Sequence, residues 1–222
     1  HENGAFVRKK TLLPKIPRPT HTNFADLNGD GRTDLIVSMY GNNIGRLSWF
    51  EKKENGDYAE RILLPRSGTL STAVHDFNGD GHPDIAALVA QEVEAMYLFL
   101  NDGKGVFTPQ IVFQGHPLYG HSSFELTDFN GDGRPDFVVT NGDNGEYPSP
   151  PKSYHGIRVY LNRGGTKFER SLFLPLNGAF RALARDYDAD GDTDIAAVSY
   201  FPNYGKSPRE SFVYFENKDG KY

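Results

Sequence analysis

The sequence predicts an all-β protein, and three observations support this. The 222 residues include 24 glycines and 14 prolines, which are the residues that separate short strands by turns. Apolar residues fall in short runs between them, without any long stretch of helical spacing. Finally, one nine-residue pattern occurs four times, and each copy is followed directly by an apolar run. Short strands and turns at a regular spacing are typical of repeated β architectures.

Composition and charge argue against several classes of function. The chain is 37% hydrophobic and 24% charged, and no apolar run approaches the ~18 residues that a membrane span needs. The formal net charge is −5, and Lys and Arg are scattered rather than clustered, which argues against nucleic-acid binding. The chain has no cysteine, so its stability must come from the core and from any bound ions.

Four copies of the pattern Asp-x-Asn/Asp-x-Asp-Gly-x-x-Asp organise the chain. They occupy residues 26–34, 76–84, 128–136 and 186–194, so a copy begins roughly every 50 to 60 residues. An apolar or β-branched run follows each copy, at residues 35–37, 85–88, 137–139 and 195–198. Such runs are typical of buried strands.

Other runs add three predicted strands to most units. They lie at 72–74, 123–126 and 181–183, at 47–50, 97–100, 157–161 and 212–215, and at 58–64, 107–113 and 168–174. A four-stranded unit repeated about every 50 residues is typical of a β-propeller blade. We therefore predict four antiparallel four-stranded blades at 17–66, 67–115, 116–176 and 177–222, the last incomplete, with residues 1–16 as the outer strand of a neighbouring blade.

The ends of the chain leave two arrangements open. Residues 2–13 match the turn and outer strand at 54–64, while the chain stops at residues 219–222, where the last outer strand would start. The N-terminal strand would therefore complete the last blade and close a four-bladed ring. Alternatively, the chain is part of a larger propeller of about seven blades. Because both ends contain the same turn, we favour the larger propeller.

The four Asp loops are predicted to bind calcium, about four ions in total. Calcium takes about six to eight oxygen ligands at ~2.3–2.6 Å, and alternating carboxylates on a tightly curled loop provide them. Side chains at positions 1, 3, 5 and 9 and the carbonyl at position 7 are the expected ligands, and Gly at position 6 permits the turn. The predicted ligand residues are Asp26, Asn28, Asp30, Arg32, Asp34, Asp76, Asn78, Asp80, His82, Asp84, Asp128, Asn130, Asp132, Arg134, Asp136, Asp186, Asp188, Asp190, Asp192 and Asp194.

Two other interpretations of these loops are weaker. An EF-hand needs Glu at position 12 and helices on both sides, whereas position 12 here is Val37, Ala87, Val139 or Ala197, inside a predicted strand. Ordinary polar turns would require four independent coincidences of spacing. Clustered carboxylates repel one another without a cation, so we expect calcium to contribute to folding. Because calcium is plentiful outside cells and scarce in the cytosol, we expect an extracellular, cell-surface or periplasmic protein.

These residues resemble the FG-GAP and VCBS repeats, which form the blades of integrin-α-type propellers and occur in many bacterial exported proteins. The resemblance covers nearly the whole chain through the Asp loops and the strands that follow them. The Phe-Gly-Gly-Ala-Pro sequence that names the repeat is absent, and residues 178–180 are at best a remnant. Residues 154–162 and 210–217 are similar to segments of bacterial VCBS-repeat proteins.

The resemblance implies that ligands meet the face opposite the metal loops. On this chain that face comprises residues 17–21, 67–71, 116–121 and 177–181, with two insertions at 141–156 and 200–210. The insertions carry Tyr147, Tyr154, Tyr200, Phe201 and Tyr204, and tyrosine-rich loops suit sugar faces and protein hot spots alike. The leading hypothesis is therefore a binding or scaffold module for a glycan or a protein.

The alternative hypothesis is an enzyme. Some propellers that resemble this one are polysaccharide lyases or sugar dehydratases, in which His or Tyr removes a proton beside a carbonyl or carboxylate. The candidate catalytic residues are His21, His121, Tyr154, His155 and Arg181. An enzyme requires at least two such side chains within ~6 Å in one pocket, one of them with a shifted pKa, whereas a binding module requires a broad aromatic surface.

Overall fold

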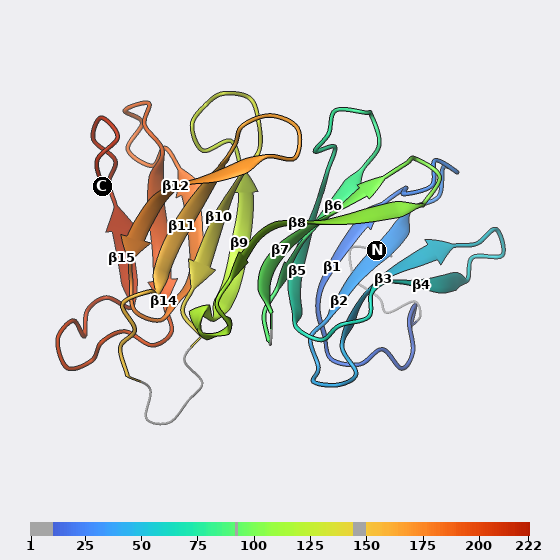
Figure 1. The fold of residues 1–222 in the computed structure, drawn as a ribbon, viewed down its shortest axis with the longest axis horizontal. Helices are drawn as coiled ribbons and strands as arrows, with labels where there is room; N and C mark the ends of the chain where they lie inside the picture. The colour runs from blue at the N-terminus through green and yellow to red at the C-terminus, as the bar shows by residue number, and fades with distance from the viewer. Residues whose placement is uncertain (1–10, 92, 144–149) are drawn as a thin grey trace, which may run out of the picture.

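The computed structural model describes residues 11–91, 93–143 and 150–222, and its strands form four antiparallel sheets in chain order (Figure 1). In these residues the helical structure is limited to one short 3-10 turn, η1 at Pro117–Tyr119, and no helix is long and apolar enough to cross a membrane. The all-β class is therefore confirmed. The strands are β1 Pro19–Ala25, β2 Asp34–Met39, β3 Arg46–Lys52, β4 Tyr58–Leu64, β5 Thr69–His75, β6 Asp84–Val89, β7 Glu94–Asn101, β8 Phe107–Gly115, β9 His121–Thr127, β10 Asp136–Asn141, β11 Gly156–Asn162, β12 Phe168–Pro175, β13 Ala179–Arg185, β14 Asp194–Ser199 and β15 Phe212–Phe215.

Each sheet is a meander whose strands pair in the order in which they occur. The first sheet contains β1 to β4, the second β5 to β8, the third β9 to β12 and the fourth β13 to β15. The first strands of successive sheets contact one another, β1 with β5, β5 with β9 and β9 with β13, so they line the inner edge of the array. This arrangement is β-propeller-like.

The hydrophobic core lies between successive sheets and is formed by alternate residues of the middle strands. One face of the second sheet, with Ile85, Ala87 and Tyr97, packs against the first sheet, and the other, with Leu88 and Leu98, packs against the third. Because side chains alternate along a strand, both faces of the second sheet are apolar. The strands β6 and β7 are accordingly buried along nearly their whole length.

The fourth sheet differs because one of its faces is uncovered. Register places Val198 opposite Phe212 and Ala196 opposite Tyr214, as Leu88 lies opposite Met96 in the second sheet. Leu88 and Met96 are fully buried, but Val198, Phe212 and Tyr214 are 40%, 65% and 43% exposed. Positions that the next sheet covers elsewhere in the array are thus open to solvent here.

The described residues form an open array. Figure 1 shows β15 at one end of the molecule and β4 near the other. The described residues therefore do not form a closed four-bladed ring, which was one of the two arrangements consistent with the sequence. The outer strand expected at residues 2–13 lies largely outside the described residues. Residues 11–16 form turns, and Leu13 and Ile16 pack against the outer face of the first sheet.

Candidate functional site

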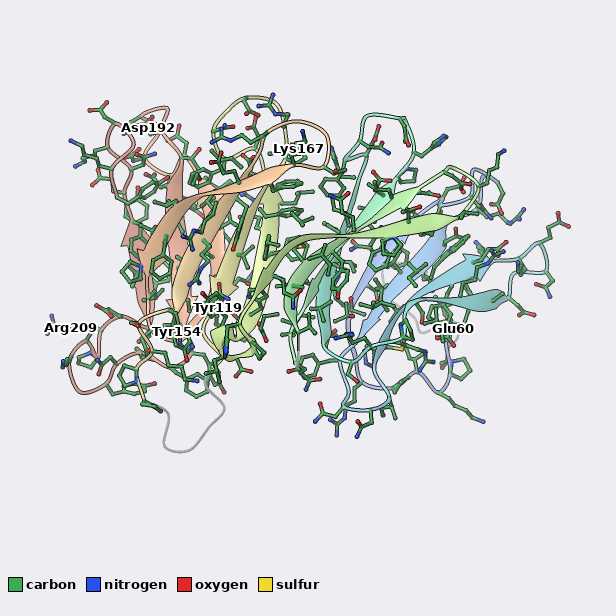
Figure 2. The ribbon with its side chains drawn as sticks, viewed as in Figure 1. Glu60, Tyr119, Tyr154, Lys167, Asp192 and Arg209 are labelled. Atoms are coloured by element: carbon green, nitrogen blue, oxygen red, sulfur yellow. The ribbon has the colours of Figure 1, made fainter. Side chains whose placement is uncertain are left out.

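The four Asp loops lie at one end of the strands. Each joins the first strand of its sheet to the second, and Figure 2 shows Asp192 of the fourth loop at that edge, with Tyr119 and Tyr154 at the opposite edge. Position 6 is a glycine in the left-handed region, as at Gly191 (φ 98°), where a side chain would be strained. Position 4 adopts this conformation too, so Ala189 has a φ of 63° in the fourth loop.

The Asp at position 9 is fully buried in every loop and binds two backbone amides. In the second loop, Asp84 accepts a hydrogen bond from Phe77 N (2.9 Å) and one from Asn101 N (2.8 Å). These donors belong to the Asp loop itself and to the end of the third strand, so the carboxylate joins two separate segments. The same pair of bonds occurs at Asp34, Asp136 and Asp194.

The pKa values of these carboxyls differ between the loops. Burial raises the pKa of Asp34, Asp84 and Asp136. The pKa of Asp194 is lowered by the hydrogen bonds from Asn217 N and then the Tyr214 hydroxyl, which lies 2.7 Å from Asp194 Oδ2. The fourth loop therefore gives its buried carboxylate a third hydrogen-bond donor besides the two backbone amides.

Each loop curls around the carboxylate of its first Asp, which accepts hydrogen bonds from backbone amides later in the loop. In the second loop, Asp76 accepts hydrogen bonds from Asp80 N (3.1 Å) and Gly81 N (2.8 Å). The equivalent bonds recur at Asp26 and Asp128, and the one from position 6 recurs at Asp186. These bonds bring positions 5 and 6 of the loop back to the carboxylate of position 1, so the polar side chains of the loop gather around one point.

The fourth loop brings three carboxylates closest together. Oxygens of Asp186, Asp188 and Asp194 lie within 4.8 Å of one another, a spacing that suits one cation with oxygen ligands at about 2.3–2.6 Å. In the first and third loops, an arginine at position 7 instead forms an ion pair with the Asp at position 5. Arg32 Nη2 lies 2.5 Å from Asp30 Oδ2, and Arg134 Nη2 lies 2.5 Å from Asp132 Oδ2. The fourth loop has Asp192 at that position.

The five candidate catalytic residues fall into three groups on the opposite face: His21 with Arg181, Tyr154 with His155, and His121. His21 Nδ1 lies 3.4 Å from Thr72 Oγ1, and burial followed by the charge of Arg181 lowers the pKa of His21. The ring of Tyr154 lies 5.4 Å from that of His155, whose Nδ1 accepts a hydrogen bond from Gly178 N (3.3 Å). The His21 contact joins β1 to β5, and the His155 contact joins the segment before β11 to the segment before β13.

His121 belongs to a third, buried network that crosses from the second sheet to the third. Glu94 Oε2 accepts a hydrogen bond from His121 N (2.5 Å), and Asn141 Nδ2 contacts His121 Nδ1. Arg158 Nη1 donates to Asn141 Oδ1 (2.7 Å), and its guanidinium lies between the rings of Tyr119 and Phe173. Burial raises the pKa of Glu94 to about 7 and lowers that of His121 to about 3.

Two adjoining cavities of about 270 Å³ each open beside this network. His121 lines one and Glu94 the other, and both cavities are lined by Tyr40 and Asp143. None of the other four catalytic candidates is among the described residues that line them.

The two insertions supply exposed aromatic side chains to this face. Tyr200 and Tyr204 are 67% and 69% exposed, and Tyr200 lies next to Phe201 with ring centroids 4.9 Å apart. Tyr147 lies outside the described residues, whereas Tyr154 stacks on Tyr119 at 5.6 Å.

The Asp loops and the strands after them match the model of the FG-GAP-like repeat in three overlapping segments, residues 26–87, 76–139 and 128–197. Together these segments span most of the chain. This chain belongs to the FG-GAP-like repeat family. The resemblance seen in the sequence is therefore confirmed.

Individual proteins share less with this chain. A T-cell immunomodulatory protein homolog of Plasmodium falciparum (isolate 3D7) is 30% identical over 114 residues, which are 47% of this chain and 16% of that protein. Among solved structures, the GH32 β-fructofuranosidase BmSUC1 of Bombyx mori has a TM-score of 0.46 and 11% identity, with 83% of this chain and 44% of that chain covered. A mutant of the same enzyme in complex with sucrose has a TM-score of 0.42 and 11% identity, with 82% of this chain and 44% of that chain covered.

Sequence reasoning missed Glu94, Asn141 and Arg158 at the end opposite the FG-GAP-like loops. A signal was present for two of them, since Glu94 directly precedes the apolar stretch that contains the predicted strand at 97–100, and Arg158 interrupts the predicted strand at 157–161. A charge in such a position needs partners from elsewhere in the fold. Their identity depends on the pairing of strands within the third sheet and, for Glu94, on a contact between repeats, which the sequence pattern does not specify.

Proposed function

We propose that this chain is a calcium-stabilised part of an extracellular β-propeller, and that it binds a glycan or a protein through the face opposite the Asp loops. The observation that carries the proposal is the separation of two kinds of loop. Short, nearly identical acidic loops occupy one end of the strands, and long, dissimilar loops with exposed Tyr200 and Tyr204 occupy the other. Repeated loops suit a structural role, and variable aromatic loops suit recognition.

Calcium is the cation that best matches the Asp loops. Their donors are carboxylate and amide oxygens, which hard cations prefer, and Asp186, Asp188 and Asp194 already converge within the fourth loop. Each ion would offset about two negative charges in a chain whose formal net charge is −5. Sites of this kind fill at the calcium concentrations found outside cells, which is why we place the protein there.

Thermal unfolding with and without calcium tests the structural role of the metal. We expect about four calcium ions per chain and a Tm at least ~10 °C higher in millimolar calcium than in EDTA, because each bound ion adds stability by mass action. Magnesium at the same concentration is the control. An unchanged Tm, or a different metal in fewer sites, would contradict this part of the proposal.

The binding role is tested by applying the calcium-loaded chain to an array of immobilised glycans and of extracellular proteins. We expect binding to at least one class, retained in excess calcium. Because the recognition loops lie away from the Asp loops, substitution of Tyr200 is expected to weaken binding without changing the calcium content. Binding that follows calcium content alone would place recognition at the Asp loops and contradict the proposal.

The uncovered face of the fourth sheet supports a larger propeller. Val198, Phe212 and Tyr214 occupy positions that are fully buried in the second sheet, where residues of the third sheet cover them. A further repeat would remove this apolar surface from water in the same way.

A pair of alanine substitutions tests this arrangement. Leu88→Ala is expected to destabilise the present chain by about 2–5 kcal/mol, and Val198→Ala by less than about 1 kcal/mol because the side chain is 40% exposed. In a longer chain with a further repeat, Val198→Ala should cost markedly more. An equally small effect in the longer chain would mean that no repeat packs on this face.

A further inference from the structure

The junction between the first two sheets holds a cleft of about 560 Å³ at the end opposite the Asp loops. Three loops form it, and they join β2 to β3, β4 to β5 and β6 to β7. Its volume falls within the ~300–1,000 Å³ of typical ligand sites. The lining residues that have a side chain are Asn42, Asn43, Pro65, Arg66, Ser67 and Gln91. All but Pro65 carry hydrogen-bonding groups, so the cleft suits a ligand that is polar on several sides.

Backbone hydrogen bonds fix the base of this cleft. Gly68 N donates to Tyr40 O (3.0 Å), and Ala90 N donates to Gly68 O (2.8 Å), so the three loops are joined where they meet the strands. Two lining residues, Asn43 and Gln91, have φ values of 63° and 85°, in the left-handed region that residues other than glycine seldom adopt. Backbone held in this region is concentrated at ligand sites, and a cleft that is already fixed loses less entropy on binding.

Two side chains of the cleft offer hydrogen-bond donors that a ligand can reach. Gln91 Nε2 donates to Asn42 Oδ1, so the amide of Asn42 is oriented and its two N–H groups point away from Gln91. Asn42 and Arg66 are both exposed. Neither the Asn42 N–H groups nor the Arg66 guanidinium donates to another described side chain or carbonyl. The donors of this wall are therefore available to a bound molecule.

The clefts at the other two junctions have a different balance of charge. Glu94, Asp143 and Lys152 line the cleft between the second and third sheets. Lys152 and Glu210 line the cleft between the third and fourth. Both of these clefts thus contain acidic groups, whereas Arg66 is the only charged group among the described residues that line the first. Arg66 forms no ion pair within the described part of the chain, so this cleft favours an anion.

A uronic acid residue is the ligand whose groups match this wall. Its carboxylate is planar and carries a single charge, which one guanidinium binds through two parallel hydrogen bonds. A phosphate monoester carries nearly two charges, more than Arg66 alone offsets. Asn43 and Ser67 provide donors and acceptors for the hydroxyl groups of a sugar. An acidic peptide also carries carboxylates, but it needs apolar pockets or a strand edge, and Pro65 is the only apolar side chain among the described lining residues.

We propose that this cleft is a subsite for a uronic acid residue of an acidic glycan, in which Arg66 pairs with the carboxylate and the amides of Asn42 and Asn43 bind hydroxyl groups. The inference rests on the proposed function, because it assigns a ligand class to the face opposite the Asp loops. Gln91 acts as a positioning residue that holds the amide of Asn42 in its donor orientation.

The test is a calorimetric titration of the calcium-loaded chain, at fixed free calcium, with trisaccharides of galacturonate, glucuronate and mannuronate. At least one is expected to bind, and its carboxyl-reduced form, in which –CH₂OH replaces each carboxylate, should bind about ten-fold more weakly. Arg66→Ala should weaken uronate binding about ten-fold, the loss of one charge-assisted contact. Arg66→Lys keeps the charge without the planar fork and should lie in between. Arg170→Ala removes an exposed arginine from β12 and is the matched control.

A second variant places a repulsive charge in the cleft. Asn42→Asp keeps the size of the side chain and the acceptor for Gln91 but replaces the donor with a carboxylate. It should weaken uronate binding about ten-fold or more with an unchanged Tm, and it should affect the carboxyl-reduced trisaccharide less.

Three results would overturn the subsite while the proposed function stands. They are equal affinities for the acidic and carboxyl-reduced trisaccharides, uronate binding that Arg66→Ala leaves unchanged, and binding of other glycans with no response to any uronate. A glutamate hexapeptide that binds at least as tightly as the uronates would assign the cleft to an acidic protein segment and overturn the glycan class. Failure to bind any glycan or protein would instead contradict the proposed function itself.

Discussion

The two ends of the strands handle buried charge in different ways. At the Asp-loop end, each of the four position 9 carboxylates, such as Asp84, is met by two backbone amides from its own repeat. At the opposite end, the buried ionisable groups Glu94 and Arg158, which come from different sheets, are connected through His121 and Asn141. One solution is local and is repeated four times, while the other occurs once in the described residues and depends on how two repeats pack.

This difference explains why one end looks structural and the other functional. A carboxylate satisfied by amides of its own loop can be copied with the loop, so every repeat gains the same support. A network that needs partners from a neighbouring sheet can be altered in one repeat without disturbing the others. Variation at the opposite end is therefore tolerated by the fold, and it is there that cavities with His121 and Glu94 occur.

The largest effect is expected from removing a position 9 carboxylate. Asp84→Ala leaves Phe77 N and Asn101 N without their acceptor inside the protein, which should lower the free energy of unfolding by about 2–5 kcal/mol. Asp80→Ala, in the same loop but exposed, should cost less than about 1 kcal/mol. Urea unfolding of both variants in EDTA separates this role from metal binding, and equal losses would show that the two positions are not structurally distinct.

A pH-dependent effect is expected at the opposite end. Burial raises the folded-state pKa of Glu94 to about 7, above its ordinary value near 4.5, so the wild type loses stability as pH rises from about 4.5 to about 7. The loss approaches about 3 kcal/mol at pH 8. His121 stays neutral over this range, and the charge of Asp143 adds to the shift.

Glu94→Gln removes this ionisation while keeping an acceptor for His121 N. The variant should therefore gain stability relative to the wild type between pH 5 and pH 8, as measured by urea unfolding at each pH in constant calcium. Glu169→Gln, at an exposed carboxylate, is the control and should follow the wild-type curve. If the Glu94→Gln and wild-type curves run parallel, Glu94 is not held neutral by burial.

The sequence predicted the repeated features of the fold because each is encoded within a single repeat. The apolar runs after the Asp loops became β2, β6, β10 and β14, and the loops themselves fall between the first two strands of every sheet. The side-chain role of Arg32 and Arg134 was not foreseen, since only the carbonyl of position 7 was considered. The partners of His121 could not be predicted, because Glu94 reaches it from another sheet and Arg158 reaches it through Asn141 from another strand of its own sheet.

The smallest effect concerns a difference among the Asp loops themselves. Arg134 Nη2 lies 2.5 Å from Asp132 Oδ2, where it would compete with the proposed calcium ion for that carboxylate. Arg134→Ala should raise the calcium affinity of the third loop several-fold, about 1 kcal/mol or less for a partly exposed ion pair. Calcium titrations followed at the Gly131 and Gly133 amide resonances report on this loop alone.

Arg163→Ala, which removes a nearby positive charge that pairs with Glu169 instead, should change the affinity less. Weaker calcium binding in Arg134→Ala would mean that the guanidinium holds the third loop in its metal-binding conformation. The first and third loops would then differ from the fourth in structure rather than in calcium affinity.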